Sequence, residues 1–288
     1  MGDVTKLFIG LVTHPRSRFN ADGRATTRLT ELGKMLRGQG FTVQTLISDR
    51  NDFDEMPQGI GFATRIKSAW LQVETEKSWS QYLQAANGTK AIDGSPGRMF
   101  YLAMFIKRAI SFLVSARPLE RLANIDSSHL RVLREGINSG ADWILVIEDD
   151  GVAENISRVA ENLAVLIPLI DSEKTDTLVN LSESISDAEL GVDAIMARAR
   201  QAHSFANGGK VVQVSPPISN TVCANVYSRG FAARFAMGIE EQGIFPSIPI
   251  DWRLNRFLMD SAATDIECFW IIPGMFIQGS MHEAPANS

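Results

Sequence analysis

The strongest constraint on the fold is a strand–helix–strand pattern in residues 6–47. Residues 6–13 (KLFIGLVT) are a continuous apolar and β-branched run, which is typical of a strand buried on both faces. Leu29, Leu32 and Leu36 follow at helical spacing, and residues 41–47 (FTVQTLI) form a second strand-like run. Because such a succession forms a parallel βαβ unit, we expect an α/β protein with a mainly parallel central sheet flanked by helices.

Length and charge bound the protein class. The 288 residues are enough for one large α/β domain with a sizeable core. The chain has 28 Lys and Arg residues against 33 Asp and Glu residues, which gives a formal net charge of −5 and argues against a nucleic-acid partner. Cys223 and Cys268 have no Cys or His at metal-ligand spacing, so we expect both to be small core residues.

One apolar segment invites a membrane interpretation. Residues 99–114 (MFYLAMFIKRAISFLV) are too few to span a bilayer and carry Lys107 and Arg108. We expect a buried amphipathic helix here; the alternative is a helix lying on a membrane surface, helped by Arg108, Arg117 and Arg121. No signal-peptide pattern precedes the first strand, so the sequence indicates a cytoplasmic protein, which the surface alternative would place in peripheral contact with the inner face of the membrane.

A second helix–strand unit ends in three acids. Residues 126–128 (DSS) offer the N-cap of a helix that Gly140 ends. Residues 143–147 (WILVI) are then a fully apolar strand, followed by the acidic tripeptide 148–150 (EDD). Ligands of open α/β sheets bind beyond the carboxyl ends of the strands, so the tripeptide stands where a ligand is expected.

The remaining elements are expected from periodicity and turn residues. Residues 52–121 form a long irregular section with helical patches at 64–76 and 99–116. Beyond residue 150 we expect helices at 153–166, 184–201, 229–238 and 251–260, and strands at 177–181, 211–214, 222–227, 269–272 and 275–278.

Adjacent acids are costly to hold together, because like charges ~4 Å apart repel by about 1 kcal/mol in water and by more in a cleft. A divalent cation removes that cost, and Mg²⁺ or Mn²⁺ takes one or two carboxylates together with phosphate oxygens and water. Alternation at a strand end points Glu148 and Asp150 to a similar side and Asp149 elsewhere. We therefore predict Glu148 and Asp150 as metal ligands; the alternative is a strand end whose acids cap a helix or meet solvent.

Four short segments follow one another along the chain: SHL at 128–130, WILVIEDD at 143–150, ANVYSRG at 224–230 and PIDW at 249–252. This ordered set resembles glycosyltransferase family 25, the lipopolysaccharide-type glycosyltransferases, over residues 125–282. The family's usual Gly-Cys before Ser-His-Leu is replaced by Asp126 and Ser127. Its N-terminal Asn-Leu-Asp-Arg-Arg-like segment is present only as residues 12–16 (VTHPR).

The resemblance implies a GT-A-type fold over residues 1–288, with a nucleotide-sugar-binding half at 1–150 and an acceptor-binding half at 151–288. It implies Mn²⁺- or Mg²⁺-dependent transfer of a sugar, as in bacterial polysaccharide biosynthesis. The donor would be a UDP- or GDP-linked sugar, and the acceptor a hydroxyl of a glycan, a lipid-linked glycan or a small molecule. Glu148 and Asp150 look like the outer acids of an Asp-x-Asp motif, with Asp149 beside the nucleotide sugar and His282 as a third metal ligand.

Further candidates for the nucleotide-sugar site follow the first strands. Thr13, His14 and Arg16 follow the first strand, and Asp49 follows the second. Arg16 offers a bidentate fork to phosphate, and Arg131 stands near the start of the helix expected after residue 126. The alternative for Arg16 is a solvated loop charge.

Asp251 matches the family position of a carboxylate that reaches the acceptor. An inverting transfer needs a base that takes the proton of the attacking hydroxyl, and Asp251 is the candidate; the alternative is an N-cap for a helix beginning at Trp252. Trp252 offers an apolar platform for a sugar face in the acceptor site, and core packing is its alternative. The alternative for His282 is a histidine of the chain's tail.

Three other functions stay open at this point. A catalytically silent homologue would bind a sugar nucleotide or a partner protein without turnover. A nucleotidyltransferase shares the metal and nucleotide logic, but its Gly-rich basic loop near the first strand is missing. Residues 144–163 also resemble the first strand and acidic pocket of a response-regulator receiver domain, yet Ser182 and Glu183 stand where its phosphoacceptor Asp is required, and its Lys is missing.

Overall fold

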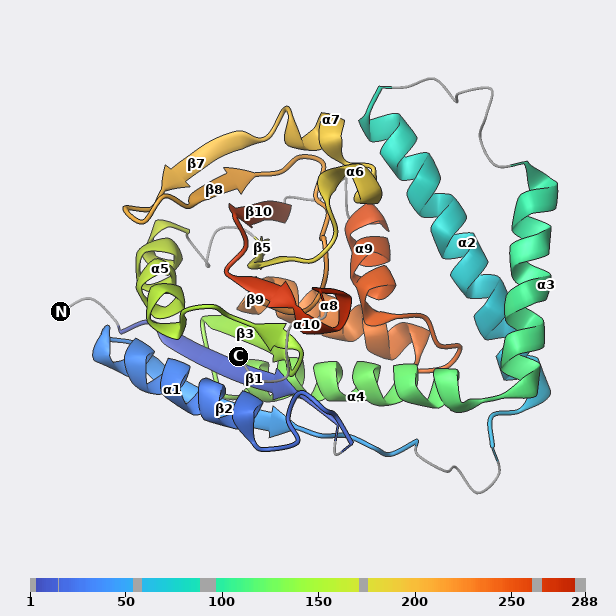
Figure 1. Ribbon diagram of the computed structural model, residues 1–288, viewed down its shortest axis with the longest axis horizontal. Helices are drawn as coiled ribbons and strands as arrows, with labels where there is room; N and C mark the ends of the chain where they lie inside the picture. The colour runs from blue at the N-terminus through green and yellow to red at the C-terminus, as the bar shows by residue number, and fades with distance from the viewer. Residues whose placement is uncertain are drawn as a thin grey trace.

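The computed structural model describes residues 4–14, 16–53, 59–88, 97–170, 176–260 and 266–282 (Figure 1). The strands are β1 (Lys6–Val12), β2 (Thr42–Ser48), β3 (Trp143–Glu148), β4 (Gly151–Val152), β5 (Asp176–Asn180), β6 (Ser182–Glu183), β7 (Arg200–Ser204), β8 (Lys210–Gln213), β9 (Ala224–Ser228), β10 (Ile266–Ile272) and β11 (Phe276–Gln278). The helices are α1 (Arg24–Gly38), α2 (Phe62–Ala86), α3 (Arg98–Val114), α4 (Arg117–Asn138), α5 (Ile156–Leu169), α6 (Asp187–Leu190), α7 (Asp193–Met196), α8 (Arg229–Gln242), α9 (Ile250–Asp260) and α10 (Gly279–His282).

Eight strands form one sheet in the order β2-β1-β3-β9-β5-β10-β8-β7. β1 pairs in parallel with β2 and β3, and β5 pairs in parallel with β10. β9 is antiparallel to β3 and β5, and β8 is antiparallel to β10 and β7. The expected α/β class and its first βαβ unit are confirmed. The sheet is mostly parallel in strand direction, as expected, but mixed, because β9 and β8 run against the other strands.

Helices cover both faces of this sheet. Leu7, Ile9 and Leu11 of β1 belong to a core shared with α1 and α5, and Phe8 belongs to a second core shared with α4, α8 and α9. Gly10 lets α4 approach the second face closely, because an added Cβ there would lie 2.0 Å from a methyl carbon of the Val132 side chain. The sheet therefore lies between two helical layers, with α4 on the face of Phe8. Cys223 and Cys268 are buried as expected.

The helix before β3 is longer than expected. α4 begins at Arg117 with Pro118 in its first turn, where the missing N–H of proline costs no helical hydrogen bond. Residues 126–128 therefore lie in the middle of α4, and the predicted N-cap at this position is wrong. Asp126 and His129 point instead into the buried side of the helix.

The predicted polar helix at 184–201 is also wrong. Ser186 and Glu189 form a capping box that starts α6, and Gly191, with a φ of 75°, ends it after one turn. α7 and the edge strand β7 follow. The cap at Ser186 and the glycine at 191 therefore limit this segment to a single helical turn, although its residue spacing is helical.

α2 and α3 lie side by side at one end of the molecule (Figure 1). α3 is a helix as expected, but the prediction that it is buried is wrong: within it, only Ala109 and Phe112 are buried, in a small cluster with α2 and the first turn of α4. Among the described helices, none alone is long and apolar enough to cross a membrane, although α3 and α4 together pass that test as a pair bent by 92°.

Candidate functional site

The acidic tripeptide forms the turn between β3 and β4, next to a small sheet of order β4-β11-β6. Neighbouring segments hold the backbone of this turn through three hydrogen bonds: Glu148 N to Cys223 O (2.8 Å), Asp149 N to Val12 O (2.9 Å) and Gly279 N to Asp150 O (2.7 Å). The turn is therefore fixed to β1, to the segment before β9 and to the start of α10.

Glu148 points toward α4, where its Oε1 lies 3.0 Å from Nε2 of His129. Burial, together with the charges of Asp150 and Asp149, raises the pKa of Glu148 to about 8. Burial lowers the pKa of His129 to about 4. Burial disfavours both charged forms, so both shifts favour the uncharged pair.

Asp149 and Asp150 have different partners. Oδ2 of Asp149 accepts a hydrogen bond from Oγ1 of Thr13 at 2.5 Å, so the structure brings Thr13 into the site. Oδ2 of Asp150 accepts one from Oγ of Ser280 at 2.5 Å, while its Oδ1 is buried and has no hydrogen bond to a described residue. Burial raises the pKa of Asp150, against the opposing effect of hydrogen bonding by Ser280 and Gln278.

Asp251, near the start of α9, lies within electrostatic reach of the same pair. Its Oδ1 accepts a hydrogen bond from Val222 N at 2.8 Å, so the side chain bonds to the segment before β9. Burial, and next the charge of Glu148, raise the pKa of Asp251 to about 6, while Val222 and His129 act in the opposite direction. The structure thus places Asp251 within electrostatic reach of both Glu148 and His129.

A buried ion pair on α4 supports this arrangement. Nε of Arg253 lies 2.6 Å from Oδ2 of Asp126, and the two side chains are 1% and 0% exposed. Arg253 also donates to the backbone oxygen of Ile244 at 2.9 Å. Burial raises the pKa of Asp126 to about 7, although Arg253 opposes this shift. The pair joins α4 to α9, and so holds His129 and Asp251 in register.

The predicted metal ligands fit a divalent cation in part. Within the described residues, no group of three or more His, Cys, Asp or Glu side chains is arranged to hold a metal ion. His282 lies in α10, but its side chain is outside the described part of the chain. Mg²⁺ that arrives with a diphosphate needs only one or two carboxylates, and Asp150 offers a buried oxygen without a partner. The ligand set Glu148, Asp150 and His282 stays a prediction.

The other predicted nucleotide contacts divide into two groups. His14 and Arg16 follow β1, where Arg16 N donates to Nδ1 of His14 at 3.1 Å, and exposed Asp49 follows β2. These residues lie at the same sheet edge as the acidic turn, because β1, β2 and β3 are parallel. Arg131 is half-buried on α4, and at ~100° per residue its side chain projects about 200° around the helix from His129.

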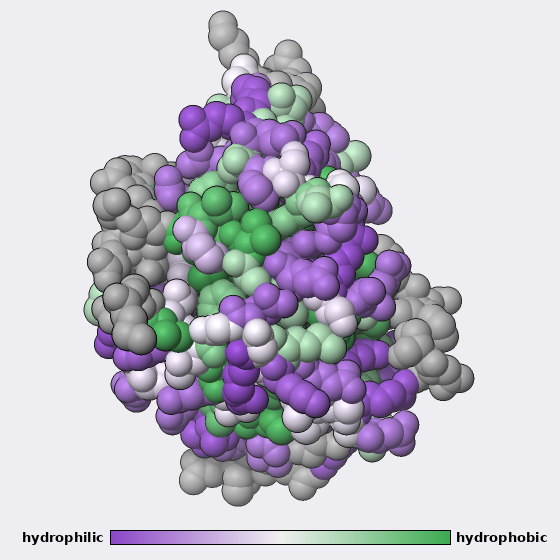
Figure 2. Space-filling view, turned by 90° about the vertical axis from the view of Figure 1, so that its left-hand side faces the viewer, coloured by the Kyte–Doolittle hydropathy of each residue, from purple (hydrophilic) through white to green (hydrophobic). Residues whose placement is uncertain are grey.

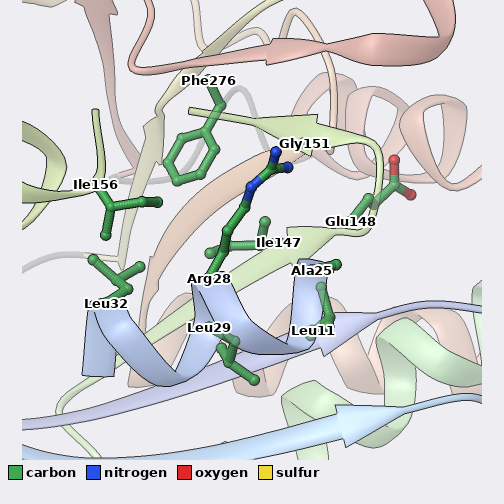
Figure 3. Close-up of a pocket in the computed structure, with 10 residues that line it drawn as sticks. All are labelled: Leu11, Ala25, Arg28, Leu29, Leu32, Ile147, Glu148, Gly151, Ile156 and Phe276. Atoms are coloured by element: carbon green, nitrogen blue, oxygen red, sulfur yellow. The ribbon is translucent and has the colours of Figure 1, made fainter. Parts of the chain in front are cut away.

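Neither Trp252 nor the cavity beside α1 offers much for ligand binding. The Trp252 ring is half-buried and packs edge-to-face on Trp79, with 6.4 Å between centroids. A cavity of about 20 Å³ lies between α1, β3 and α5, where Arg28 extends toward Gly151 and the Glu148 carboxylate points away (Figure 3). Its size suits about one water rather than a nucleotide.

Sequence reasoning missed the partners of the acids. Asp126 and His129 gave a usable signal, since they are polar residues three apart on an otherwise apolar helical face. Arg121, two turns earlier on α4, places a positive charge near Glu148 that lowers the pKa of this acid. Nothing in the local sequence pointed to Ser280. In comparisons with known proteins, the chain matches no protein-family model and no curated sequence.

Proposed function

We propose that this protein is a metal-dependent glycosyltransferase with a GT-A-type fold. It moves a sugar from a nucleotide-sugar donor to a hydroxyl of a glycan, a glycolipid or a small acceptor. The observation that carries the proposal is the 3.0 Å contact between Glu148 and His129 at the carboxyl end of β3, with Asp251 within electrostatic reach of both. Each comes from one of the segments PIDW, EDD and SHL, and the mixed sheet between helical layers is compatible with that fold.

The donor fits the edge formed by the carboxyl ends of β1, β2 and β3, where open α/β sheets bind nucleotides. Arg16 and Arg121 supply positive charge around the acidic turn for the diphosphate. A divalent cation held by Asp150 would neutralise the charge that develops on the leaving nucleotide. Thr13 fixes Asp149, and the uncharged Glu148–His129 pair limits the negative charge that the donor meets.

Asp251 serves as the base that takes the proton of the acceptor hydroxyl. Its pKa of about 6 brings the group closer to neutral pH than an ordinary aspartate, which favours proton transfer while the carboxylate form still dominates at pH 7. The hydrogen bond from Val222 N fixes one carboxyl oxygen and thereby orients the other.

The test separates turnover from binding. UDP-, GDP-, dTDP- and CMP-linked sugars are incubated with Mn²⁺ and a panel of sugar acceptors, and the released nucleotide is measured. Asp251→Asn should lower turnover by roughly 10²- to 10⁴-fold with nucleotide affinity unchanged, while Glu154→Gln, at an exposed acid just beyond the turn, should keep wild-type turnover. Nucleotide binding without transfer to any acceptor would favour the catalytically silent homologue instead.

A further inference from the structure

The exposed apolar side chains of the described residues concentrate on one helical pair. Of fourteen large hydrophobic residues that are exposed, seven lie on α3 and two on α2. They are Met99, Phe100, Leu102, Ile106, Ile110, Leu113 and Val114 on α3, and Phe62 and Trp70 on α2. A patch of this kind marks an interaction site on a folded protein.

The residues of α3 form a stripe along the helix. Met99, Leu102, Ile106, Ile110 and Leu113 recur every three or four positions, so they share one face. The adjoining face packs on α2 through Ala109 and Phe112. Trp70 extends the stripe onto α2, since its ring is 56% exposed and contacts the Phe105 ring edge-to-face at 5.7 Å.

All charged side chains of α3 are positive. The helix contains Arg98, Lys107 and Arg108 and no acidic residue. Arg108 pairs with Glu76 of α2, whereas Arg98 and Lys107 are exposed. Exposed Arg117 follows at the start of α4. An apolar helical face edged by cations, in a chain whose net charge is −5, complements a lipid surface that carries negative headgroups.

Two other occupants fit less well. A second copy packed on the stripe about a two-fold axis near Ile106 would bring two Lys107 side chains together, and α3 has no acid to offset their repulsion. A spanning orientation is disfavoured because α3 has only 17 residues and its inner face packs on α2.

We infer that the exposed stripe of α3, with Trp70 of α2, docks this protein on an anionic lipid surface, the helix lying in the plane of the interface. The inference does not depend on the proposed activity. α4 starts three residues after α3 ends and carries His129 to the acidic turn, so docking through α3 would hold the candidate site at a fixed distance from the lipid.

Co-sedimentation of the full chain with lipid vesicles tests this inference. Binding should be weak to phosphatidylcholine vesicles, stronger when phosphatidylglycerol is included, and reduced by salt. Ile106→Ser/Ile110→Ser should weaken partition roughly tenfold or more. Lys107→Glu reverses one exposed charge. It should weaken binding to anionic vesicles and leave the weak binding to phosphatidylcholine vesicles unchanged. Thermal unfolding checks that each variant is folded.

The matched control lies on α5, on the side of the molecule that Figure 2 shows, where apolar and hydrophilic residues are mixed. Val165 and Leu169 are 45% and 56% exposed, close to the 48% and 57% of Ile106 and Ile110. Val165→Ser/Leu169→Ser should bind vesicles as the wild type does. No binding to anionic vesicles, or equal losses in both double variants, would overturn the inference. A lipid-free dimer that Ile106→Ser/Ile110→Ser dissociates would instead assign the stripe to a second copy.

Discussion

His129 in the middle of α4 and Glu148 at the end of β3 are joined by a 3.0 Å contact between Nε2 and Oε1. The contact gives one of three adjacent acids a partner on α4. Asp149 is bound to Thr13, so Asp150 is the acid of the turn that keeps a buried oxygen without a partner among the described residues. The three acids thus have three different roles in the turn.

Stability should fall as pH rises from 7 to 8. The pKa of Glu148 is raised from 4.5 to about 8 by burial, so its contribution is complete below 4.5 and is lost as pH rises through about 8. His129, with a lowered pKa, is neutral in the folded chain and mostly neutral in the unfolded chain in this window, so its opposing contribution is small. Ionisation of Glu148 should therefore lower the unfolding free energy by about 1 kcal/mol between pH 7 and pH 8.

Urea unfolding of the wild type and of Glu148→Gln at pH 7 and pH 8 checks this expectation. The variant has no titrating group at this position, so its unfolding free energy should change much less over the interval. Equal pH dependence in the two proteins would show that Glu148 is already ionised in the folded chain at pH 7.

Arg253→Met should be strongly destabilising. It leaves Asp126 buried without its charged partner, and breaking such a pair costs about 3–5 kcal/mol. Arg256→Met is the matched control on the same helix, because Arg256 and Asp260 are 4.0 Å apart and partly or largely exposed, so its cost should stay below about 1 kcal/mol. Chemical denaturation of both variants measures the difference, and equal losses would contradict the structural role of the buried pair.

Gly10→Ala should loosen the packing of α4 on the sheet. The new Cβ would lie 2.0 Å from a Val132 methyl carbon, and such overpacking costs about 1–3 kcal/mol. Val132→Ala removes the clashing methyl groups, so the double variant should be less destabilised than the sum of the two single variants. Strict additivity in urea unfolding would mean that the two residues are not in contact.

Much of the fold was predictable because its signals are local. The run at 6–13, the leucines of α1 and the apolar strand 143–147 each carry one unambiguous period. The start of α4 was missed because Asp126 and Ser127 look like a cap, whereas Asp126 is buried against Arg253, far away in the sequence. The exposure of α3 was missed for a related reason, since an apolar helix does not reveal which of its faces has a partner.

The position of the three acids was predictable from the sequence, whereas their hydrogen-bond partners were not. A strand that ends in three acids places them at the carboxyl edge by geometry alone. The partners of these acids come from α4, β1 and α10, and only the tertiary structure brings them together. Whether the acids hold a metal and a nucleotide stays a prediction for experiment.

The most direct measurement is calorimetric titration of UDP, GDP, dTDP and CMP into the protein with and without Mn²⁺. The account predicts that one nucleotide class binds only when Mn²⁺ is present. Asp150→Ala should abolish this binding, because it removes the carboxylate with the unpartnered oxygen, while Glu154→Gln should leave it unchanged. Absence of binding by every nucleotide, or Mn²⁺-dependent binding that survives Asp150→Ala, would contradict the proposed donor site.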